Sequence, residues 1–357
     1  MNIFEEMEKY GHEELVFWYD KTTGLKAIVG IHDTTLGPAL GGCRMWPYDS
    51  EEDAITDVLR LSRGMTYKNA AMGLDLGGGK SVIWADSRTD KSEALLRAFG
   101  RLIQSLGGRY ITAEDVGITA EDMAMVAREA QFVGGLKETS GDPSPATALG
   151  VMEGMKAAAT MVFGSPDLSG KHVAIQGMGH VGFLLANLLK EAGARLTVTD
   201  IHPEESRSAA EDLGAVWVEP KEIYGVEADI FAPCALGAIL NDDTIPQLKV
   251  RIVAGSANNQ LREPRHGLEL MRRGIVYVPD YVINGGGVVN VGDEFHRDGY
   301  HHDRAYSRVR LIGRQVSEIL RRAADEGIQS QEAADRLAEA RINAMGRVKS
   351  TYIPRMD

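Results

Sequence analysis

The chain has 357 residues, 44 % of them hydrophobic and 25 % charged, which is ordinary for a globular protein and favours two domains. Its net charge of −12 comes without a basic stripe, which argues against a nucleic-acid partner. The acidic N-terminus and the lack of a long apolar run predict neither a signal peptide nor a membrane span. The two cysteines, Cys43 and Cys234, offer no disulfide framework or zinc site, so we expect a cytoplasmic protein without a metal.

The first part of the chain alternates short β-forming runs with segments of helical periodicity. The clearest helix has apolar side chains at i, i+3 and i+4 and ends at Gly107. The expected elements are a hairpin of residues 15–20 and 25–33, a helix from Asp53, a strand at 81–86, a helix at 91–108, a short strand from 109 and a helix capped by Thr119.

Residues 134–147, "GGLKETSGDPSPAT", are dense in Gly, Pro and Ser and are the best candidate for a hinge between domains. We predict one domain of residues 1–141, to which residues 332–357 return, and a second domain of residues 142–331. Further helices are expected at 148–164, from about His302 to Gly327, and at 330–348.

The stretch "GLDLGGGKS" at residues 73–81 is similar in composition to a phosphate-binding P-loop. A P-loop requires a glycine six residues before its lysine, but that position holds Leu74, and Gly73 is one residue too early. A P-loop also leads from a strand into a helix, whereas Lys80 here precedes an apolar run that is typical of a strand. A P-loop NTPase is therefore a disfavoured alternative.

The most specific pattern is "KHVAIQGMGHVGFLLANLLKEAGARLTVTD". A strand at 173–176 leads into G-x-G-x-x-G at Gly177, Gly179 and Gly182, and a helix and a second strand follow. The first glycine permits a tight turn, the second lets the backbone approach a pyrophosphate, and the third lets the helix pack close to the strand. The helix N-terminus favours the anionic pyrophosphate. The pattern predicts a Rossmann-type dinucleotide-binding unit.

The second strand of this unit ends at Asp200, 23 residues after Gly177. A carboxylate at this position accepts hydrogen bonds from ribose hydroxyls and repels a 2′-phosphate, so NAD is favoured over NADP. The alternative is a purely structural glycine turn, but strand, helix, second strand and acid occur here in the expected order.

Catalytic candidates lie in the first domain, where Lys68 and Lys80 flank the small apolar and glycine-rich stretches "NAAMG" and "LGGG". Asp115 follows a predicted strand in "ITAEDVG". Most lysines lie on solvated faces, which is the alternative here. Desolvation and a second nearby cation lower the pKa of a lysine, and a value of about 7 to 8 suits a general base.

These residues lie within a set of motifs that resembles the glutamate/leucine/phenylalanine/valine group of amino acid dehydrogenases. The resemblance covers nearly the whole chain, and many motifs occur in the same order as in the family. The motifs are "GGCRM", "GMTYKNAAMGLDLGGGK", "GRYITAEDVG", "GDPSPATALGV", the glycine fingerprint, "IYGVEADIFAPCALGAILND", "VAGSANNQL" and "YVPDYVINGGGVVNV".

The resemblance implies an α/β fold, with a doubly wound Rossmann-type NAD domain, a second α/β domain for substrate and oligomerisation, and an active site in the cleft between them. It implies oxidative deamination, in which an L-amino acid, NAD and water give a 2-oxo acid, ammonium and NADH. Lys68 would hold the substrate carboxylate, Lys80 would activate the water, and Asp115 would carry protons to and from the nitrogen. Closure at the hinge would dry the site.

The resemblance also implies which residues contact the cofactor and the substrate. For Cys234, a role as a buried packing thiol remains an equal alternative. The expected NAD-binding residues are Thr147, Gly177, Met178, Gly179, His180, Val181, Gly182, Asp200, Ile201, Cys234, Ala235, Ala257 and Asn258. The expected substrate-binding residues besides Lys68 are Leu40, Gly41, Gly42, Ala113, Val288 and Val291.

The side-chain pocket implied by the resemblance is aliphatic and looks like that of leucine-oxidising members. Glutamate-oxidising members have a lysine where this chain has Leu40, and a buried unpaired carboxylate would cost several kcal/mol, or at least about a thousandfold. Leucine, isoleucine and valine should all react, because apolar pockets discriminate one methylene by only about 1 to 3 kcal/mol. Phenylalanine is the second candidate substrate.

Two further expectations complete the sequence-based interpretation. A non-catalytic NAD-binding protein on the same fold is the alternative to an enzyme, and it would predict replacement of Lys68, Lys80 or Asp115, which are all present. The family resemblance also implies a homo-oligomer, with an octamer typical of leucine-oxidising members.

Overall fold

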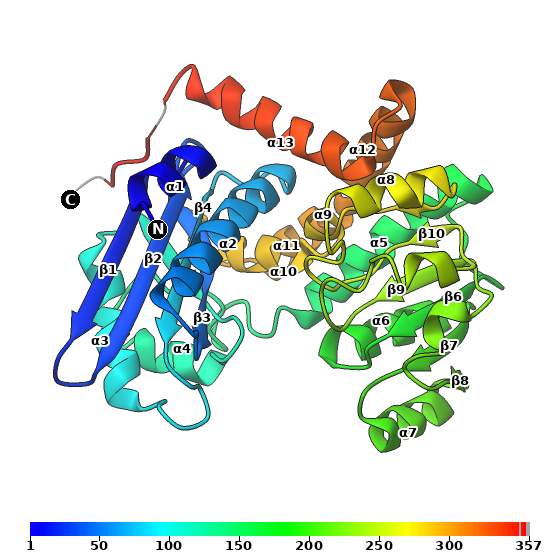
Figure 1. The fold of residues 1–357 in the computed structure, drawn as a ribbon, viewed down its shortest axis with the longest axis horizontal. Coiled ribbons are helices and arrows are strands. Elements are labelled where there is room, and N and C mark those ends of the chain that lie inside the picture. Colours follow the sequence, from blue (N-terminus) through cyan, green and yellow to red (C-terminus); the bar gives the residue numbers. More distant parts are fainter. Residues whose placement is uncertain (350, 355–357) are drawn as a thin grey trace. The chain divides into compact units, whose positions relative to one another are not determined.

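The computed structural model describes residues 1–349 and 351–354 and divides the chain into two compact units (Figure 1). Unit 1 contains Met1–Asp142, Val291–His302 and Ala338–Asp357, and unit 2 contains Pro143–Asn290 and Asp303–Leu337. Residues 291–302 cluster with unit 1, although the sequence had assigned them to the second domain. A Cβ atom at Gly134 of unit 1 would lie 2.8 Å from the side chain of Val291 and 3.1 Å from that of Phe295, a long-range contact that periodicity does not reveal.

Unit 1 is built on a mixed five-stranded sheet. The strands are β1 (Glu14–Asp20), β2 (Leu25–Asp33), β3 (Ala39–Trp46), β4 (Gly77–Trp84) and β5 (Tyr110–Ala113). Their order is β1-β2-β4-β3-β5, in which β2 is antiparallel to both β1 and β4, and β3 is parallel to both β4 and β5. The predicted hairpin is confirmed as β1 and β2.

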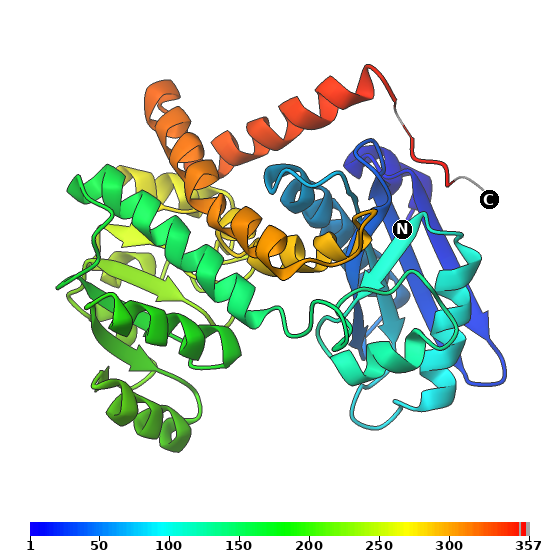
Figure 2. The same cartoon turned by 180° about the vertical axis from the view of Figure 1, so that it is seen from behind.

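Helices cover both faces of this sheet. They are α1 (Ile3–Tyr10), α2 (Glu51–Ala71), α3 (Glu93–Ser105) and α4 (Ala120–Val126). Figure 1 shows α1 and α2 on one face, and Figure 2 shows α3 and α4 on the other. Because side chains alternate along a strand, Ile28 packs with α2 while Ala27 and Val29 pack with α3. The predicted cap at Thr119 is confirmed, with a full capping box.

Unit 2 contains a six-stranded sheet in which every paired strand is parallel. The strands are β6 (His172–Gln176), β7 (Arg195–Thr199), β8 (Val216–Trp217), β9 (Ile230–Pro233), β10 (Ile252–Val253) and β11 (Val276–Tyr277). Their order is β11-β10-β9-β6-β7-β8, so the chain runs outward from β6 on both sides. This is the order of a Rossmann fold, in which ligands bind where the strand order reverses, here between β6 and β9.

The helices of unit 2 are α5 (Ser144–Phe163), α6 (His180–Glu191), α7 (Pro203–Leu213), α8 (Arg265–Arg272), α9 (Asp280–Ile283) and α12 (Ile312–Glu326). Three more are α10 (Gly286–Gly292), which crosses from unit 2 into unit 1, α11 (His302–Arg310) and α13 (Ser330–Gly346). Short 3-10 turns occur at Ile223–Gly225, Ile245–Gln247 and Asp293–Phe295. Figure 2 shows α5 and α6 side by side, in agreement with their mutual contacts.

Two predicted boundaries need correction. The strand that carries Lys80 begins at Gly77, whereas the sequence predicted its start after Lys80, because the glycines themselves form ladder pairs with β2 and β3. The helix α5 begins at Ser144, inside the predicted hinge, because Pro at its first turn is compatible with a helix.

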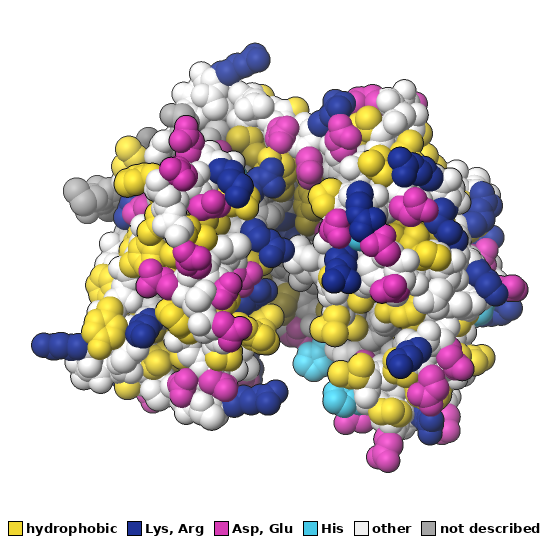
Figure 3. All heavy atoms as spheres, viewed as in Figure 1, with side chains coloured by type: hydrophobic (Ala, Val, Ile, Leu, Met, Phe, Trp, Pro, Cys, Tyr) yellow, Lys and Arg dark blue, Asp and Glu magenta, His cyan; other side chains and the backbone are white. Residues whose placement is uncertain are grey.

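The surface and the helices of the described residues offer few further constraints. In the part of the chain that the structure describes, every helix is too short or too polar to cross a bilayer. On the face shown in Figure 3, acidic and basic side chains are interspersed among apolar ones over both units.

Candidate active site

The glycines before Lys80 allow close packing inside unit 1. A Cβ atom at Gly78 would overlap the backbone of Thr66 on α2, and one at Gly79 would lie 2.6 Å from the ring of Tyr110. Asn69 of α2 donates from Nδ2 to the Gly77 carbonyl at 2.6 Å. The glycines of "LGGGK" therefore belong to a strand that packs closely against α2 and its neighbouring strands. This packing is not that of a phosphate-binding loop.

Lys80 points to the α2 face of the sheet. Val82, two residues further along β4, packs with α2 side chains such as Ile55 and Val58. Since side chains alternate along a strand, Lys80 lies on the same face as Val82. The lysine is only 4 % exposed. A buried ammonium group requires a partner of opposite charge.

Asp115 is that partner. Its Oδ1 lies 3.1 Å from Nζ of Lys80, and its Oδ2 accepts from Nε of Arg44 at 3.1 Å. The residue follows β5 in a turn closed by the backbone bond from Ile118 N to the Asp115 carbonyl at 2.9 Å. Burial of the carboxyl group would raise its pKa, but the charges of Lys80 and then Arg44 outweigh burial and hold the pKa below its usual value.

Arg44 is a member of this cluster that the sequence-based prediction missed. It lies on β3, its guanidinium also donates to Oδ2 of Asp57 on α2 at 2.9 Å, and Tyr48 donates to the same oxygen at 2.7 Å. The motif "GGCRM" contains Arg44 and was noted only for its family resemblance. Because Asp57 and Asp115 lie 58 residues apart in sequence, no local spacing could have paired them through one arginine.

Lys68 lies on α2 and is half-buried. Its neighbours in the helix, Thr66 and Asn69, are the residues that bring α2 against Gly77 and Gly78 of β4. The packing of α2 therefore places the backbone at Lys68 beside the strand that carries Lys80.

Four of the expected substrate-binding residues lie on the paired strands β3 and β5. Gly42 is paired with Ala113, and Leu40 with Ile111. Leu40 is 1 % exposed. A Cβ at Gly41 would overlap the Gly79 carbonyl, and one at Gly42 would lie 2.8 Å from Cβ of Asp115. Glycine at both positions therefore lets β3 lie tightly against β4 and the Asp115 turn.

Val288 and Val291 lie on α10, three residues apart and so on one side of the helix. Val291 is 7 % exposed, and a Cβ at Gly134 would lie 2.8 Å from its side chain. The boundary between the two units falls within this helix, with Val288 in unit 2 and Val291 in unit 1.

The glycine fingerprint of unit 2 has the geometry expected of a dinucleotide-binding turn. Gly177 has φ +101°, a conformation that favours glycine, and a Cβ there would lie 2.7 Å from Ala235. A Cβ at Gly182 would overlap the Gly177 carbonyl, so α6 packs directly on the turn. Gly179 faces open space, and it caps α6 without a side-chain hydrogen bond. Free N–H groups beside open space fit a pyrophosphate.

Asp200 lies against this turn. One of its oxygens accepts from the backbone N–H of Met178 at 2.7 Å, and the other accepts from that of His202 at 3.1 Å. His180 and Ile201, which flank the turn, are exposed, and Val181 is half-buried. The residues present therefore fit the adenosine half of a dinucleotide.

The loops after β9 and β10 carry Cys234, Ala235, Ala257 and Asn258, and α5 carries Thr147. Ala235 and Asn258 are exposed, Ala257 is buried, and Cys234 and Thr147 are half-buried. Thr147 donates to the Pro143 carbonyl, and Asn258 accepts from Asn284 at 2.7 Å. Burial raises the pKa of the Cys234 thiol, which suits a packing role rather than a reactive one.

Both loops contain a residue in a left-handed conformation that the sequence did not indicate. Ala238 has φ 58° and Asn259 has φ 51°, and the N–H of Ala238 donates to the Asn259 carbonyl at 2.7 Å. Such backbone strain concentrates at functional sites. It lies here at the carboxyl ends of the strands, where Rossmann folds bind ligands.

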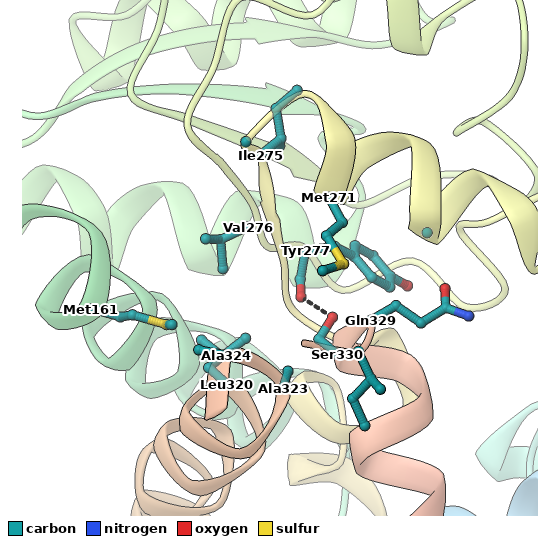
Figure 4. Close-up of a pocket in the computed structure, with 13 residues that line it drawn as sticks. Met161, Met271, Ile275, Val276, Tyr277, Leu320, Ala323, Ala324, Gln329 and Ser330 are labelled. Atoms are coloured by element: carbon teal, nitrogen blue, oxygen red, sulfur yellow. Dashed lines mark hydrogen bonds between the residues drawn. The ribbon is translucent and has the colours of Figure 1, made fainter. Parts of the chain in front are cut away.

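Unit 2 also has an apolar cavity of about 180 Å³ that contains none of these residues (Figure 4). Met161 of α5, Met271 of α8 and Leu320 of α12 line it, and Ser330 donates to the Tyr277 carbonyl at its edge at 2.5 Å. Its lining is apolar apart from Gln329, Ser330 and the phenol of Tyr277, and burial raises the pKa of that phenol well above its usual value, so the cavity offers no group for acid–base chemistry near neutral pH.

The chain is similar to proteins of known activity over almost its whole length. Residues 13–132 match the family "Glu/Leu/Phe/Val dehydrogenase, dimerisation domain", and residues 200–354 match "Glutamate/Leucine/Phenylalanine/Valine dehydrogenase". The chain is 57 % identical to leucine dehydrogenase of Bacillus cereus, over 99 % of this chain and 97 % of that protein. It is 48 % identical to phenylalanine dehydrogenase of Bacillus thermotolerans, over 98 % of this chain and 93 % of that protein.

A solved structure agrees with these sequence matches. L-tryptophan dehydrogenase from Nostoc punctiforme superposes with a TM-score of 0.86 and 45 % identity, over 97 % of this chain and 100 % of that chain. The fold, the sequence identity and the family matches therefore all indicate an amino acid dehydrogenase, and the matches cover both units. The chain belongs to the glutamate/leucine/phenylalanine/valine dehydrogenase family of amino acid oxidoreductases.

Proposed function

We propose that this protein catalyses the reversible, NAD-dependent oxidative deamination of L-leucine, with L-valine and L-isoleucine as further substrates. The observation that carries the proposal is the buried Lys80–Asp115 pair, with 3.1 Å between Nζ and Oδ1. It occurs in a chain that is 56–57 % identical to leucine dehydrogenases of several bacteria. The products are the 2-oxo acid, ammonium and NADH.

The polar groups of unit 1 suit the steps of this reaction. Lys68 binds the substrate carboxylate as a cation. Lys80 takes a proton from the water that attacks the imine carbon, and its charge stabilises the developing oxyanion. Asp115 passes a proton to the nitrogen, so that the C–N bond breaks with ammonia as the leaving group and a carbonyl forms. The carboxylate of Asp115 suits this role because it already contacts Lys80.

The cofactor supplies an acceptor for the hydride that leaves the α-carbon. Gly177, Gly179 and Gly182 would hold its pyrophosphate at the N-terminus of α6, and Asp200 would accept from its ribose hydroxyls. Two features support this assignment, namely the open space at Gly179 and the contact between Asp200 and Met178. A 2′-phosphate would meet the Asp200 carboxylate, so we propose NAD rather than NADP.

The choice of leucine rests on aliphatic residues at the expected pocket positions. Leu40, Ala113, Val288 and Val291 carry neither charge nor hydrogen-bonding groups, so a substrate carboxylate would be buried without a partner. Phenylalanine is the second candidate substrate, since a relative with 48 % identity is a phenylalanine dehydrogenase.

We also propose a cytoplasmic homo-oligomer, and an octamer in particular. Both cysteines are free thiols, which suits a reducing compartment. Phe17 and Tyr19 are 45 % and 65 % exposed on the edge strand β1, within residues that match a dimerisation domain. Light scattering on the purified protein would measure the assembly, and a monomeric mass would contradict it.

The decisive experiment is an assay of NADH formation with leucine, valine, isoleucine, phenylalanine and glutamate, repeated with NADP. We expect leucine to have the highest kcat/KM, glutamate to react at least about a thousandfold less well, and NADP to be a poor substitute. A kcat/KM for phenylalanine above that for leucine would select the second candidate. No NADH with any amino acid would favour a non-catalytic NAD-binding protein.

A further inference from the structure

The Asp115 carboxylate is held by two cations from neighbouring strands. Oδ1 faces Lys80 on β4, and Oδ2 faces Arg44 on β3, each at 3.1 Å. Arg44 is paired with Val82 in the β3–β4 register, so Arg44 and Lys80 lie on the same face of the sheet, two residues apart along it. Each carboxylate oxygen therefore has its own cationic partner.

Arg44 is itself fixed in place. Its Nη1 donates to Oδ2 of Asp57 at 2.9 Å, and Tyr48 donates to that oxygen at 2.7 Å. The Tyr48 carbonyl accepts from Nε1 of Trp84, at the end of β4, at 2.7 Å. The guanidinium is thus anchored to α2 and, through Tyr48, to the strand that carries Lys80.

This arrangement has a consequence for turnover. Lys80 must exchange its partner when a water and a substrate enter, so a carboxylate held by Lys80 alone would lose its orientation at that moment. A planar guanidinium with two fixed carboxylate partners is pre-organised and keeps Asp115 in place independently of the lysine. Arg44 also preserves a balancing positive charge beside Asp115 when Lys80 moves or loses its proton.

We propose that Arg44 is a positioning residue for Asp115, and that Asp57 holds Arg44 for this purpose. The inference rests on the proposed function of Asp115 as proton carrier. Arg44 touches neither substrate nor cofactor in this proposal and acts only through the carboxylate. The competing account is a purely structural clamp, in which Arg44 joins β3 to α2 through Asp57 and its contact with Asp115 is incidental.

The test compares the full-length variants Arg44→Gln, Arg44→Lys and Asp57→Asn with Arg97→Gln. Arg97 is a matched control, since it forms an ion pair with Glu129 at 2.6 Å in the same unit, away from Asp115. For Arg44→Gln we expect kcat with leucine to fall about 10- to 100-fold, the loss of a charged hydrogen bond, while KM changes by less than about threefold. NADH affinity should stay at the wild-type value.

Two further comparisons distinguish a positioning role of Arg44 from a purely structural one, namely rescue by a conservative variant and coupling to a variant of Asp115. Arg44→Lys keeps a cation near Oδ2 and should recover most of the lost kcat, and Asp57→Asn should lower kcat in the same direction by about three- to tenfold. In an Asp115→Asn background, Arg44→Gln should change the residual kcat by less than about twofold, because the two residues act as one unit. If Arg44→Gln does not fold, Asp57→Asn is measured in both backgrounds instead.

Several results would overturn the inference. They are a kcat within about twofold of wild type in Arg44→Gln, an equal loss in Arg97→Gln, or an undiminished loss in the Asp115→Asn background, since independent effects multiply. A wild-type protein that forms no NADH with any amino acid would overturn the proposed function and this inference with it. An active wild type with an unaffected Arg44→Gln variant overturns the inference alone.

Discussion

Both units contain a glycine-dense stretch, but the glycines have different surroundings in the two stretches. In unit 1, the glycines of β4 are surrounded by backbone, and a Cβ at Gly78 would overlap Thr66 of α2. In unit 2, Gly177 and Gly182 are equally crowded, but Gly179 between them faces open space at the start of α6. Crowded glycines let elements pack closely, whereas an open glycine at a helix N-terminus leaves room for a ligand.

The largest effect expected from this comparison is that of Gly78→Ala. The added methyl group meets backbone, which cannot rotate away, so α2 must move off β4 at a cost of about 3 kcal/mol or more. We expect a strongly lowered Tm for unit 1 and loss of both leucine turnover and soluble yield, measured by calorimetry and activity. A variant with wild-type Tm would show that α2 does not pack on β4 as described.

A second way to sharpen the comparison is pH, because the α2 contact of unit 1 includes two buried histidines. Nε2 of His12 lies 2.8 Å from Oγ of Ser62, and Nδ1 of His32 lies 2.8 Å from Oγ1 of Thr66. Burial lowers the pKa of His12 to about 3 and also lowers that of His32. His12 is therefore neutral in the folded state above about pH 3, while an unfolded chain binds its proton below about pH 6.5.

The sign of the effect follows from that difference in bound protons. Between about pH 6.5 and pH 3 the unfolded state binds more protons, so stability falls as the pH falls. His12 alone should lower the free energy of unfolding by about 2 kcal/mol from pH 7.5 to pH 5. The free energies of unfolding of wild type and His12→Gln are measured in urea at pH 7.5 and pH 5. The contribution of His12 is the difference between the two proteins in how much this free energy changes with pH. Equal pH dependence in the two proteins would remove His12 as its source.

Gly179→Ala should have a smaller and different effect from Gly78→Ala. Gly179 has φ −68°, which any residue adopts, and no atom within 4 Å of its Cβ position. We expect an unchanged Tm and a Kd for NADH that rises about tenfold, because the methyl group occupies the space of the pyrophosphate. Calorimetric titration checks this, and unchanged NADH affinity would contradict the assignment of the turn.

An effect of similar size to that of Gly179→Ala is expected on the cofactor preference of Asp200→Ser. Removing the carboxylate removes its repulsion of a 2′-phosphate, so the ratio of kcat/KM for NAD to that for NADP should fall by about tenfold. Met178 loses a hydrogen-bond acceptor in the same variant, so NADH affinity should also weaken modestly. An unaltered ratio would place the ribose elsewhere.

Local patterns predicted most elements of the fold. The β1–β2 hairpin, α3, the capping box at Thr119 and the β6–α6–β7 unit all follow from periodicity and turn chemistry. The start of β4 was wrong, because glycine runs carry no β signal of their own and this one is a strand through its partners. The single predicted helix from His302 to Gly327 is α11 and α12, separated at Leu311.

The candidate site was predictable where a motif is local and not where it depends on tertiary contacts. The glycine fingerprint gives its turn directly. Lys80 and Asp115 were candidates from their local surroundings, the family resemblance assigned their roles, and the structure places the two side chains 3.1 Å apart. Arg44 escaped notice because its two partners come from α2 and from the turn after β5. The strained residues Ala238 and Asn259 escaped notice because only one loop packed against another requires them.

The central claim is tested most directly by Lys80→Ala, with Lys91→Ala as a control because Lys91 also pairs with an aspartate, Asp122, at 2.7 Å. NADH formation from leucine and NADH binding are measured in both variants. We predict that Lys80→Ala loses about 10²- to 10⁴-fold in kcat while its Kd for NADH stays at the wild-type value, and that Lys91→Ala retains activity. Wild-type-like turnover in Lys80→Ala would contradict the account.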